Sequence, residues 1–400
     1  DALATAICTQ MGRPAAQCPG EIGGFLHRGR TMTDLGSTAL ADIHLADQSG
    51  RTRFMQHRPV GVVLVLAPWN YPWLTAVNSI APALVAGNAV LVKHADQTPL
   101  VSEAMTAAWH AEGLPEGVLS HLHADHDHVA ALVADPRIDR VAFTGSVGGG
   151  RAVHRAAAGT FTPVGLELGG HDAGYVRADA NLDAAIAGLA DGAFFNAGQS
   201  CCSIERIYVH RSLYDRFVEG IVAEAERLVL GDPADPATTL GPVVRTSAAE
   251  RLRGALAEAL SAGATACVDT TRFDRDGDGA FVAPQVLTDL PGHVALAHEE
   301  IFGPLVGVWP VDSDEEALAR IDDDPYGLTA SIWTRDLDAA ADLGSRLDVG
   351  TVYANRCDVL DPELAWVGVK HSGRGHTLSV LGYSALTRPQ SFLLEHPSEA

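Results

Sequence analysis

Lysine is scarce in this 400-residue sequence, and acidic residues far outnumber basic ones. The 28 basic residues include only Lys93 and Lys370 as lysines, and the 50 acidic residues give a net charge of −22. Such a surface repels phosphate backbones and anionic lipids, which argues against nucleic acid or a membrane as a partner. Because arginine is used almost everywhere else, a retained lysine hints at a position that needs a compact ammonium group.

Cysteines and long apolar runs are also scarce. Six cysteines in 400 residues do not make the disulfide framework of a small secreted domain. They fit a reducing cytosol, where a free thiol can be a catalyst, and a cytoplasmic location is therefore expected. The apolar run at 60–67 is too short to span a membrane, and the first residues have no signal-peptide pattern.

The order of apolar runs predicts an α/β protein, and 400 residues exceed what one core usually organises. Residues 1–27 are expected to form a helix. The run at 61–67 is typical of a buried parallel strand, and further strands are expected at 89–93 and 140–143, the last entering a glycine-containing loop at 144–150. Alternation with helices predicts a doubly wound sheet, in which ligands bind beyond the C-terminal strand ends.

A second α/β pattern begins near His171. The sequence predicts its strands at 206–210, 304–311, 331–334 and 351–355, and helices at 213–229 and 247–262. A polar strand–turn–strand is expected at 41–59, around Gln48-Ser49-Gly50.

Two segments carry the strongest chemical signal. Cys201 follows Gly198-Gln199 on a turn of small residues, which favours a nucleophile. Glu167 is followed by Leu-Gly-Gly, where glycines permit close approach of the backbone, and this favours a general base. The competing interpretations are a small buried cysteine and a solvated carboxylate at a helix end, and neither explains the flanking glycines. Cys202 is expected to point away from the site, because adjacent side chains diverge.

In motif and spacing, these two segments resemble the signature of the NAD(P)-dependent aldehyde dehydrogenase superfamily. Further segments are similar to that family's motifs, in the same order: Pro68-Trp69-Asn70-Tyr71-Pro72, Lys93-His94-Ala95-Asp96-Gln97-Thr98-Pro99, Phe143-Thr144-Gly145-Ser146 and Glu299-Glu300-Ile301-Phe302-Gly303-Pro304. The resemblance covers essentially the whole chain. It implies an aldehyde dehydrogenase-like fold, with a Rossmann-type cofactor domain, an α/β catalytic domain and a small oligomerisation β-ribbon.

The resemblance also implies a division of the chain. An N-terminal arm ahead of Asp1 is expected to be missing, and a homodimer or homotetramer is expected. The implied parts are an NAD-binding domain at 1–40 and 60–170, a catalytic domain at 171–371, a return to the NAD-binding domain at 372–385, and oligomerisation elements at 41–59 and 386–400.

The catalytic roles follow from the same resemblance. Cys201 would attack a small-molecule aldehyde substrate, and Asn70 with the backbone N–H of Cys201 would hold the oxyanion. Glu167 would activate the water that hydrolyses the thioester to a carboxylate. The residue at 171 departs from the family pattern, because His171 stands where relatives often carry lysine.

The implied substrate pocket has two aromatic walls, which favour an apolar or aromatic aldehyde. No cation other than Arg356 is a candidate to face it, and this weighs against acidic semialdehydes. The implied pocket residues are Tyr71, Leu360 and Trp366.

The implied cofactor is NAD, with NADP possible. Ser146 would contact the pyrophosphate, and Lys93 and Asp96 the adenosine ribose. An acid at 96 repels a 2′-phosphate, which favours NAD, although aspartate is shorter than the family's glutamate and His94 replaces a proline. The implied cofactor-binding residues are Trp69, Lys93, Asp96, Gly145, Ser146, Glu300 and Phe302.

Three other functions stay open. A CoA-acylating dehydrogenase would share Cys201 but tends to lack the glutamate base. A catalytically silent homologue would be expected to have lost Cys201 or Glu167. A metal-dependent hydrolase rests only on the H-x-H-x-D-H pattern at 121–126. That pattern follows a helix-to-strand turn that the family also has, so it is interpreted as a solvated loop and no metal site is predicted.

Overall fold

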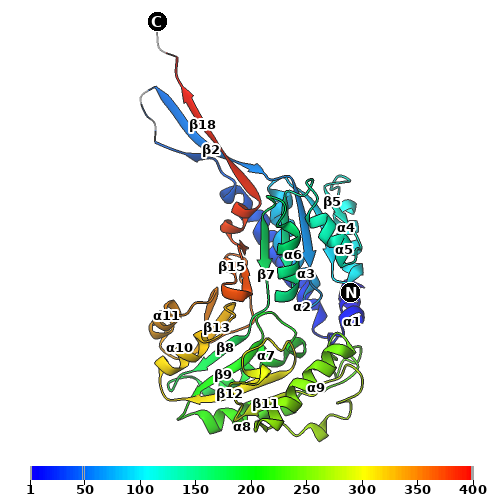
Figure 1. Cartoon of the computed structure of the whole chain (residues 1–400), viewed down its shortest axis with the longest axis vertical. Coiled ribbons are helices and arrows are strands. Elements are labelled where there is room, and N and C mark those ends of the chain that lie inside the picture. The colour runs from blue at the N-terminus through cyan, green and yellow to red at the C-terminus, as the bar shows by residue number, and fades with distance from the viewer. Residues whose placement is uncertain (1, 47, 49, 398–400) are drawn as a thin grey trace.

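The computed structural model describes residues 2–46, 48 and 50–397. Two mainly parallel sheets lie one above the other in Figure 1, and a long ribbon projects from the upper one. The last described residues lie at the tip of the ribbon, far from the first described ones. None of the described helices combines the length and apolarity needed to cross a membrane.

The upper sheet has six strands in the order β16-β7-β6-β3-β4-β5. Strands β3 to β7 are parallel, and β16 pairs antiparallel with β7. The chain reverses direction of travel across the sheet between β3 and β6, which is where doubly wound sheets bind ligands. The strands are β3 (Val62–Ala67), β4 (Ala89–His94), β5 (Leu119–His121), β6 (Arg140–Thr144), β7 (Val164–Glu167) and β16 (Gly373–Arg374).

Helices connect and cover these strands, as expected for right-handed crossovers in a parallel sheet. They are α1 (Ala2–Met11), α2 (Cys18–Ala39), α3 (Pro72–Val85), α4 (Pro99–Ala111), α5 (His126–Val133) and α6 (Val147–Ala157).

The lower sheet has seven strands in the order β10-β11-β12-β9-β8-β13-β14, parallel except for β10. Its strands are β8 (Asp172–Val176), β9 (Ile204–His210), β10 (Thr265–Ala266), β11 (Gln285–Thr288), β12 (Leu305–Val311), β13 (Thr329–Trp333) and β14 (Thr351–Ala354). Its helices are α7 (Leu182–Phe194), α8 (Tyr214–Glu226), α9 (Thr246–Ser261), α10 (Asp314–Asp322) and α11 (Leu337–Ser345). The short strands β15 (Trp366–Val367) and β17 (His376–Thr377) pair with each other on the way back to the upper sheet.

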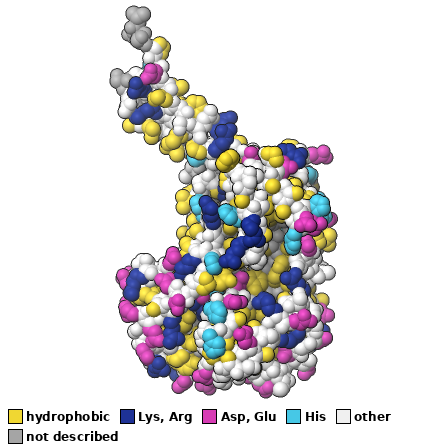
Figure 2. Space-filling model, in the orientation of Figure 1, with side chains coloured by type: hydrophobic (Ala, Val, Ile, Leu, Met, Phe, Trp, Pro, Cys, Tyr) yellow, Lys and Arg dark blue, Asp and Glu magenta, His cyan; other side chains and the backbone are white. Residues whose placement is uncertain are grey.

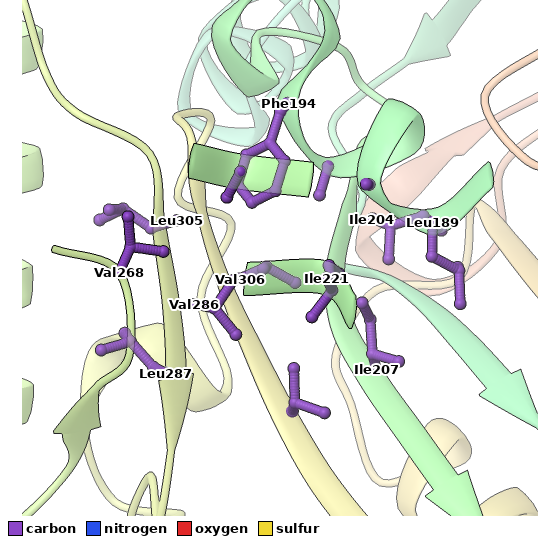
Figure 3. Close-up of a cluster of buried hydrophobic side chains, with 14 of the residues drawn as sticks. Leu189, Phe194, Ile204, Ile207, Ile221, Val268, Val286, Leu287, Leu305 and Val306 are labelled. Atoms are coloured by element: carbon purple, nitrogen blue, oxygen red, sulfur yellow. The ribbon is translucent and has the colours of Figure 1, made fainter. Parts of the chain in front are cut away.

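Apolar side chains from adjacent strands fill the core of the lower sheet. Figure 3 shows Val286, Val306 and Ile207, from β11, β12 and β9, together with Phe194 at the end of α7. Burial of such side chains contributes about 1.5–3 kcal/mol each. This core therefore holds the segment after Phe194, which carries Cys201, against a rigid support.

The projecting ribbon consists of β1 (Ile43–His44), β2 (Arg51–Pro59) and β18 (Thr387–Glu395). The rings of Phe54 and Phe392 stack across the two long strands with centroids 4.5 Å apart. Figure 2 shows hydrophobic side chains along this arm. The predicted turn at Gln48-Ser49-Gly50 includes Ser49, which lies outside the described residues.

Two local predictions were wrong. Residues 1–27 do not form one helix, because Gly12 adopts a positive φ of 84° and Pro14 cannot donate a helical hydrogen bond, so the chain breaks between α1 and α2. Residues 144–150 are not all loop, because α6 begins at Val147 after the N-cap Ser146. The other predicted strands are confirmed within one or two residues. The division into domains stays a prediction, which the antiparallel pairing of β16 with β7 supports at 372–385.

Candidate active site

Every site residue predicted from the sequence lines one cavity of about 1080 Å³. The cavity lies at the C-terminal ends of β3, β4, β6 and β7, and the segment after α7 closes it from the lower sheet. It brings together Asn70, Glu167 and Cys201 with the predicted cofactor and pocket residues, which are Trp69, Lys93, Asp96, Gly145, Ser146, Glu300, Phe302, Tyr71, Leu360 and Trp366.

The backbone that presents Cys201 is held in a strained conformation. Asn196, Ala197 and Gly198 have positive φ values of 53°, 55° and 67°. Left-handed conformations cost non-glycine residues about 1–2 kcal/mol each and persist only when the surroundings enforce them. A Cβ at Gly198 would lie 2.2 Å from the carbonyl oxygen of Gly303, so glycine is required there. The strain thus fixes the position of the following Gln199-Ser200-Cys201.

Cys201 and Cys202 differ in their surroundings. The Cys202 side chain is buried, and its Sγ donates to Oδ1 of Asp358 at 3.0 Å. A hydrogen bond with Cys201 and burial raise the pKa of Cys202 well above its usual value. Cys201 is less buried. Both residues line the cavity, so the expectation that Cys202 points away from it was wrong. The raised pKa keeps the Cys202 thiol protonated.

Asn70 is positioned through its backbone. Its carbonyl oxygen accepts hydrogen bonds from Nη2 of Arg13 and, at 3.4 Å, from Nδ2 of Asn196. Within the described residues its side-chain amide has no hydrogen-bond partner, so its N–H donors remain available to the cavity. An oxyanion needs such preorganised neutral donors.

A buried ion pair that the sequence did not reveal holds this segment in place. Arg13 pairs with Glu21, stacks over the ring of Tyr71 at 4.3 Å, and donates through Nε to Oδ1 of Asn196 at 3.0 Å. Oε1 of Glu21 accepts the backbone N–H of Trp73 at 2.8 Å, at the start of α3. The pair therefore ties α2 to both the Asn70 and the Cys201 segments.

Replacing Arg13 by methionine is expected to lower the free energy of unfolding by about 3–5 kcal/mol, because Glu21 would stay buried without a partner. Urea denaturation followed by circular dichroism measures the change. The matched control is Arg211→Met, which breaks the exposed pair with Asp312 and is expected to change stability little. Equal effects of the two substitutions would contradict the role given to Arg13.

Glu167 lies at the end of β7, next to the end of β6. Its carboxylate accepts hydrogen bonds from Oγ1 of Thr144 at 3.0 Å and from Oγ1 of Thr377 on β17. Burial raises the pKa of Glu167, and the two threonine hydroxyls and the charge of Arg28 oppose that rise. A carboxyl group with a raised pKa beside a cavity is a suitable general base.

One wall of the cavity is suited to a pyrophosphate. Gly145, Ser146 and Gly149 line it at the N-terminus of α6, where Oγ of Ser146 accepts the N–H of Gly149 at 3.1 Å. A Cβ at Gly145 or Gly149 would lie within 2.8 Å of the Phe143 ring, so both glycines are needed for close packing. Helix N-termini bind anions through their free N–H groups and dipole. Nearby, Nζ of Lys93 donates to Oδ1 of Asp96 at 2.8 Å.

A second wall is suited to a ribose. Oε1 of Glu300 is buried and has no hydrogen-bond partner within the described residues. Burial raises the pKa of Glu300 to about 8. A hydroxyl donor at this position would satisfy the buried oxygen, which fits the predicted contact with a cofactor ribose.

Phe302 is held beside this wall in a left-handed conformation with a φ of 56°. The carboxylate of the buried Glu205 accepts the backbone N–H groups of Ile301 and Phe302 at 2.7 and 2.8 Å. The rings of Trp69 and Phe302 lie edge to face, 5.5 Å apart. The residues present therefore fit a dinucleotide at these walls.

The substrate side contains charged groups that the sequence did not reveal. Asp358 and Arg28 line the cavity together with Tyr71, Leu360 and Trp366. Burial raises the pKa of Asp358 to about 6, and its Oδ1 accepts Oγ of Ser200 at 2.6 Å. The expectation that Arg356 was the only candidate cation was wrong: Arg356 does not line the cavity, and Arg28 does.

The histidine-rich segment does not converge as the hydrolase pattern requires. Within the described ranges, one group of possible metal ligands has its atoms within 4.8 Å of one another, and it consists of the exposed Glu103, His121 and His123. Asp125 instead caps α5 by accepting the N–H of His128 at 2.9 Å. The two-metal interpretation of 121–126 therefore has no geometric support.

The side chains that sequence reasoning missed share one property, which is that their partners lie far away along the chain. Arg13 contacts Asn70 across 57 residues, and Thr377 contacts Glu167 across 210. A single sequence carries no local signal for such pairs. The missed residues are Arg13, Glu21, Arg28, Thr144, Glu205, Asp358 and Thr377.

This fold agrees with comparisons of the sequence. The chain belongs to the aldehyde dehydrogenase family, whose pattern it matches over residues 1–392. It is 37% identical over 344 residues to the 2-hydroxymuconic semialdehyde dehydrogenase of Pseudomonas sp. (strain CF600). This match covers 85% of this chain and 71% of that protein. It is 34% identical over 399 residues to the 3,6-anhydro-alpha-L-galactose dehydrogenase of Streptomyces coelicolor, covering 99% and 81% of the two chains.

A solved structure supports the same conclusion. The succinic semialdehyde dehydrogenase from Streptococcus pyogenes, in complex with NADP+, superposes with a TM-score of 0.94 at 29% sequence identity. The match covers 99% of this chain and 86% of that one. The aldehyde dehydrogenase-like fold predicted from the sequence is thereby confirmed.

Proposed function

We propose that the protein oxidises an aldehyde to a carboxylate with NAD, through a thioester on Cys201. The observation that carries this proposal is the convergence of Cys201, Asn70 and Glu167 on one cavity. The same cavity has a helix N-terminus suited to a pyrophosphate and an unpartnered buried carboxylate oxygen on Glu300. A thiol, an amide donor and a base beside a dinucleotide site form the set that thioester chemistry needs.

The first step forms a bond between Sγ of Cys201 and the carbonyl carbon. The thiol proton leaves to water, and the carbonyl electrons move to oxygen. The side-chain amide of Asn70 and the N–H of Cys201 would hold that oxygen, each such donor contributing about 10²- to 10³-fold in rate. A bound NAD would accept the hydride that leaves the same carbon. Cys201 then carries a thioester.

The second step releases the acid. Glu167, held by Thr144 and Thr377, takes a proton from a water that attacks the thioester carbon. The carbon–sulfur bond breaks, the carboxylate leaves and the Cys201 thiol is restored. The presence of Glu167 disfavours the CoA-acylating alternative.

The choice of NAD rests on Lys93 and Asp96. Their mutual hydrogen bond at 2.8 Å is suited to two adjacent ribose hydroxyls, while the Asp96 carboxylate would repel a 2′-phosphate. The relative from Streptococcus pyogenes was solved with NADP+, whereas the NAD preference proposed here rests on the carboxylate of Asp96.

The test is absorbance at about 340 nm with NAD or NADP and a panel of aliphatic, aromatic and acidic aldehydes. We expect reduced cofactor to form, with kcat/KM about tenfold or more higher for NAD, the factor that 1.4 kcal/mol of repulsion supplies. An NADP preference would overturn the cofactor assignment alone. Folded protein that binds NAD but oxidises no aldehyde would favour the silent homologue, and failure to bind either cofactor would overturn the proposal.

The ribbon is the proposed oligomerisation element. Ile43, Leu45 and Leu393 are 46%, 45% and 62% exposed, and β18 is an edge strand with unpaired backbone groups. A homodimer or homotetramer would bury these apolar side chains and pair the backbone groups of β18. A monomer by light scattering at micromolar concentration would contradict this part of the proposal.

A further inference from the structure

An arginine of α2 is buried against the cavity on the substrate side. Arg28 is 8% exposed, and with Gly24 and His27 it forms the part of the cavity wall that α2 contributes. Asn70, which precedes α3, and Asn78 on α3 line the same cavity. Arg28 donates hydrogen bonds to Leu74 and Asn78 of α3, the helix that begins directly after the Asn70 segment, which places it at the same part of the wall as the proposed oxyanion donor.

The guanidinium of Arg28 is only partly satisfied. Its Nη1 donates to the carbonyl oxygen of Leu74 at 3.0 Å and to Oδ1 of Asn78 at 3.3 Å. Arginine has five N–H donors, and Nε and Nη2 find no acceptor within the described residues. A buried side chain that lines a cavity with unused donors has room for an acceptor from outside the chain.

The charge of Arg28 is also unpaired. No carboxylate among the described residues lies within ion-pair distance of it, whereas the buried Arg13 is paired with Glu21. Burial lowers the pKa of Arg28, and the nearby Cys202, Glu167 and Cys201 act in the opposite direction. Because an isolated buried cation is costly, its retention indicates that an anion completes the site.

The carboxylates of Glu167 and Asp358, which also line the cavity, have partners of their own. Glu167 accepts from Thr144 and Thr377, and Asp358 accepts from Ser200 and Cys202. The helix N-terminus at Ser146 and the Lys93–Asp96 pair lie on the proposed cofactor side. An anion at Arg28 would thus belong to the aldehyde substrate.

We infer that Arg28 binds a carboxylate at the far end of the substrate, so that the preferred substrates are aldehydes that also carry an acidic group. This deepens the proposed function and rests on it. The planar fork of arginine matches a carboxylate through two parallel N–H···O bonds, which lysine does not reproduce. An apolar aldehyde, which the aromatic walls suggest, is then a poorer substrate than an aldehyde of the same length that carries a carboxylate.

The experiment compares three probes of similar size with wild type: 4-oxobutanoate, its methyl ester and butanal, followed by the five- and six-carbon oxoacids. We expect kcat/KM for the best acid to exceed that for its ester by about 10- to 100-fold, as charge-assisted hydrogen bonds give. In Arg28→Gln this ratio should fall to about one through a higher KM for the acid, whereas any change in kcat from the lost charge near Glu167 should be the same for acid, ester and butanal. Arg28→Lys should keep part of the preference.

Arg245→Gln is the matched control, because Arg245 also lines the cavity but is exposed. Its acid-to-ester ratio should equal that of wild type. If Arg245→Gln removes the preference and Arg28→Gln does not, the assignment to Arg28 is wrong. If Arg28→Gln lowers kcat equally for all probes, shifts the pH profile and leaves the acid-to-ester ratio unchanged, Arg28 acts on Glu167 alone, which also overturns the inference.

A measurement on wild type keeps the test decisive if Arg28→Gln does not fold. Succinate and glutarate should inhibit butanal oxidation competitively, and their neutral dimethyl esters should inhibit at least about tenfold less. Equal inhibition by acids and esters, with butanal still oxidised, would overturn the role of Arg28 and leave the proposed function intact. No oxidation of butanal, ester or acid would instead count against the proposed function itself.

Discussion

Cys201→Ala is expected to lower aldehyde-dependent NADH formation by at least about 10⁴-fold, because no covalent adduct can form without the thiol. NAD binding should persist, since Cys201 is absent from the walls suited to pyrophosphate and ribose. The measurement is the initial rate at about 340 nm, with binding of NAD followed by quenching of tryptophan fluorescence. Trp69 lies against Phe302 beside the ribose wall and would report occupancy.

Cys202→Ala is the matched control for this prediction. The substitution removes an adjacent thiol, but that thiol is 1% exposed and is engaged with Asp358. Ser200 would still donate to Asp358 at 2.6 Å, so we expect activity within about tenfold of wild type. An inactive Cys202→Ala enzyme beside an active Cys201→Ala enzyme would reverse the assignment of the nucleophile.

Glu167→Gln is expected to separate the two halves of the reaction. The thioester should still form, giving a burst of about one NADH per active site, followed by turnover slowed about 10²- to 10⁴-fold. Stopped-flow absorbance measures the burst. Mass spectrometry of the intact protein should find the acyl group on the variant and not on Cys201→Ala. Loss of the burst with retained NAD binding would mean that Glu167 acts before hydride transfer.

The pH dependence of the slow step follows from the raised pKa of Glu167. Burial favours the neutral carboxyl, and only the carboxylate can accept a proton from water. Hydrolysis should therefore be slow at low pH and rise as pH passes through a value above the usual glutamate pKa. Thr377→Val removes a hydrogen bond that lowers this pKa, so its profile should move to higher pH. A pH profile that Thr377→Val leaves unmoved would contradict this role of Glu167.

Much of the site was predictable because its motifs encode local geometry. Gly198 adopts a positive φ, and a Cβ there would lie 2.2 Å from the carbonyl oxygen of Gly303, so only glycine fits. Ser146 is the N-cap of the helix that follows it. Such requirements restrict residue type at fixed spacing, so the sequence alone indicates them. The predicted residues Asn70, Glu167 and Cys201 then meet because they follow β3, end β7 and follow α7.

The limits of local reasoning appear at α1 and α2. The pattern of residues 1–27 suggested one helix, and the break at Gly12-Arg13-Pro14 was missed because apolar residues continue on both sides of it. The break matters for the site, since it turns Arg13 inward to Asn70, Tyr71 and Asn196. The glycine and proline of this turn are visible in the sequence, but the contacts that the turn gives Arg13 involve residues far away along the chain.

By itself, the sequence indicated the alternation of strands and helices and the family, and it predicted a nucleophile, a base and an amide donor. The tertiary structure decided which charges surround them: the Arg13–Glu21 pair behind Asn70, the threonines on Glu167, and the unpaired Arg28 in the substrate wall. An arginine on a helix carries the same local pattern whether it faces solvent or a cavity. Its burial and its unused donors depend on packing between segments far apart in the chain, which no local spacing records.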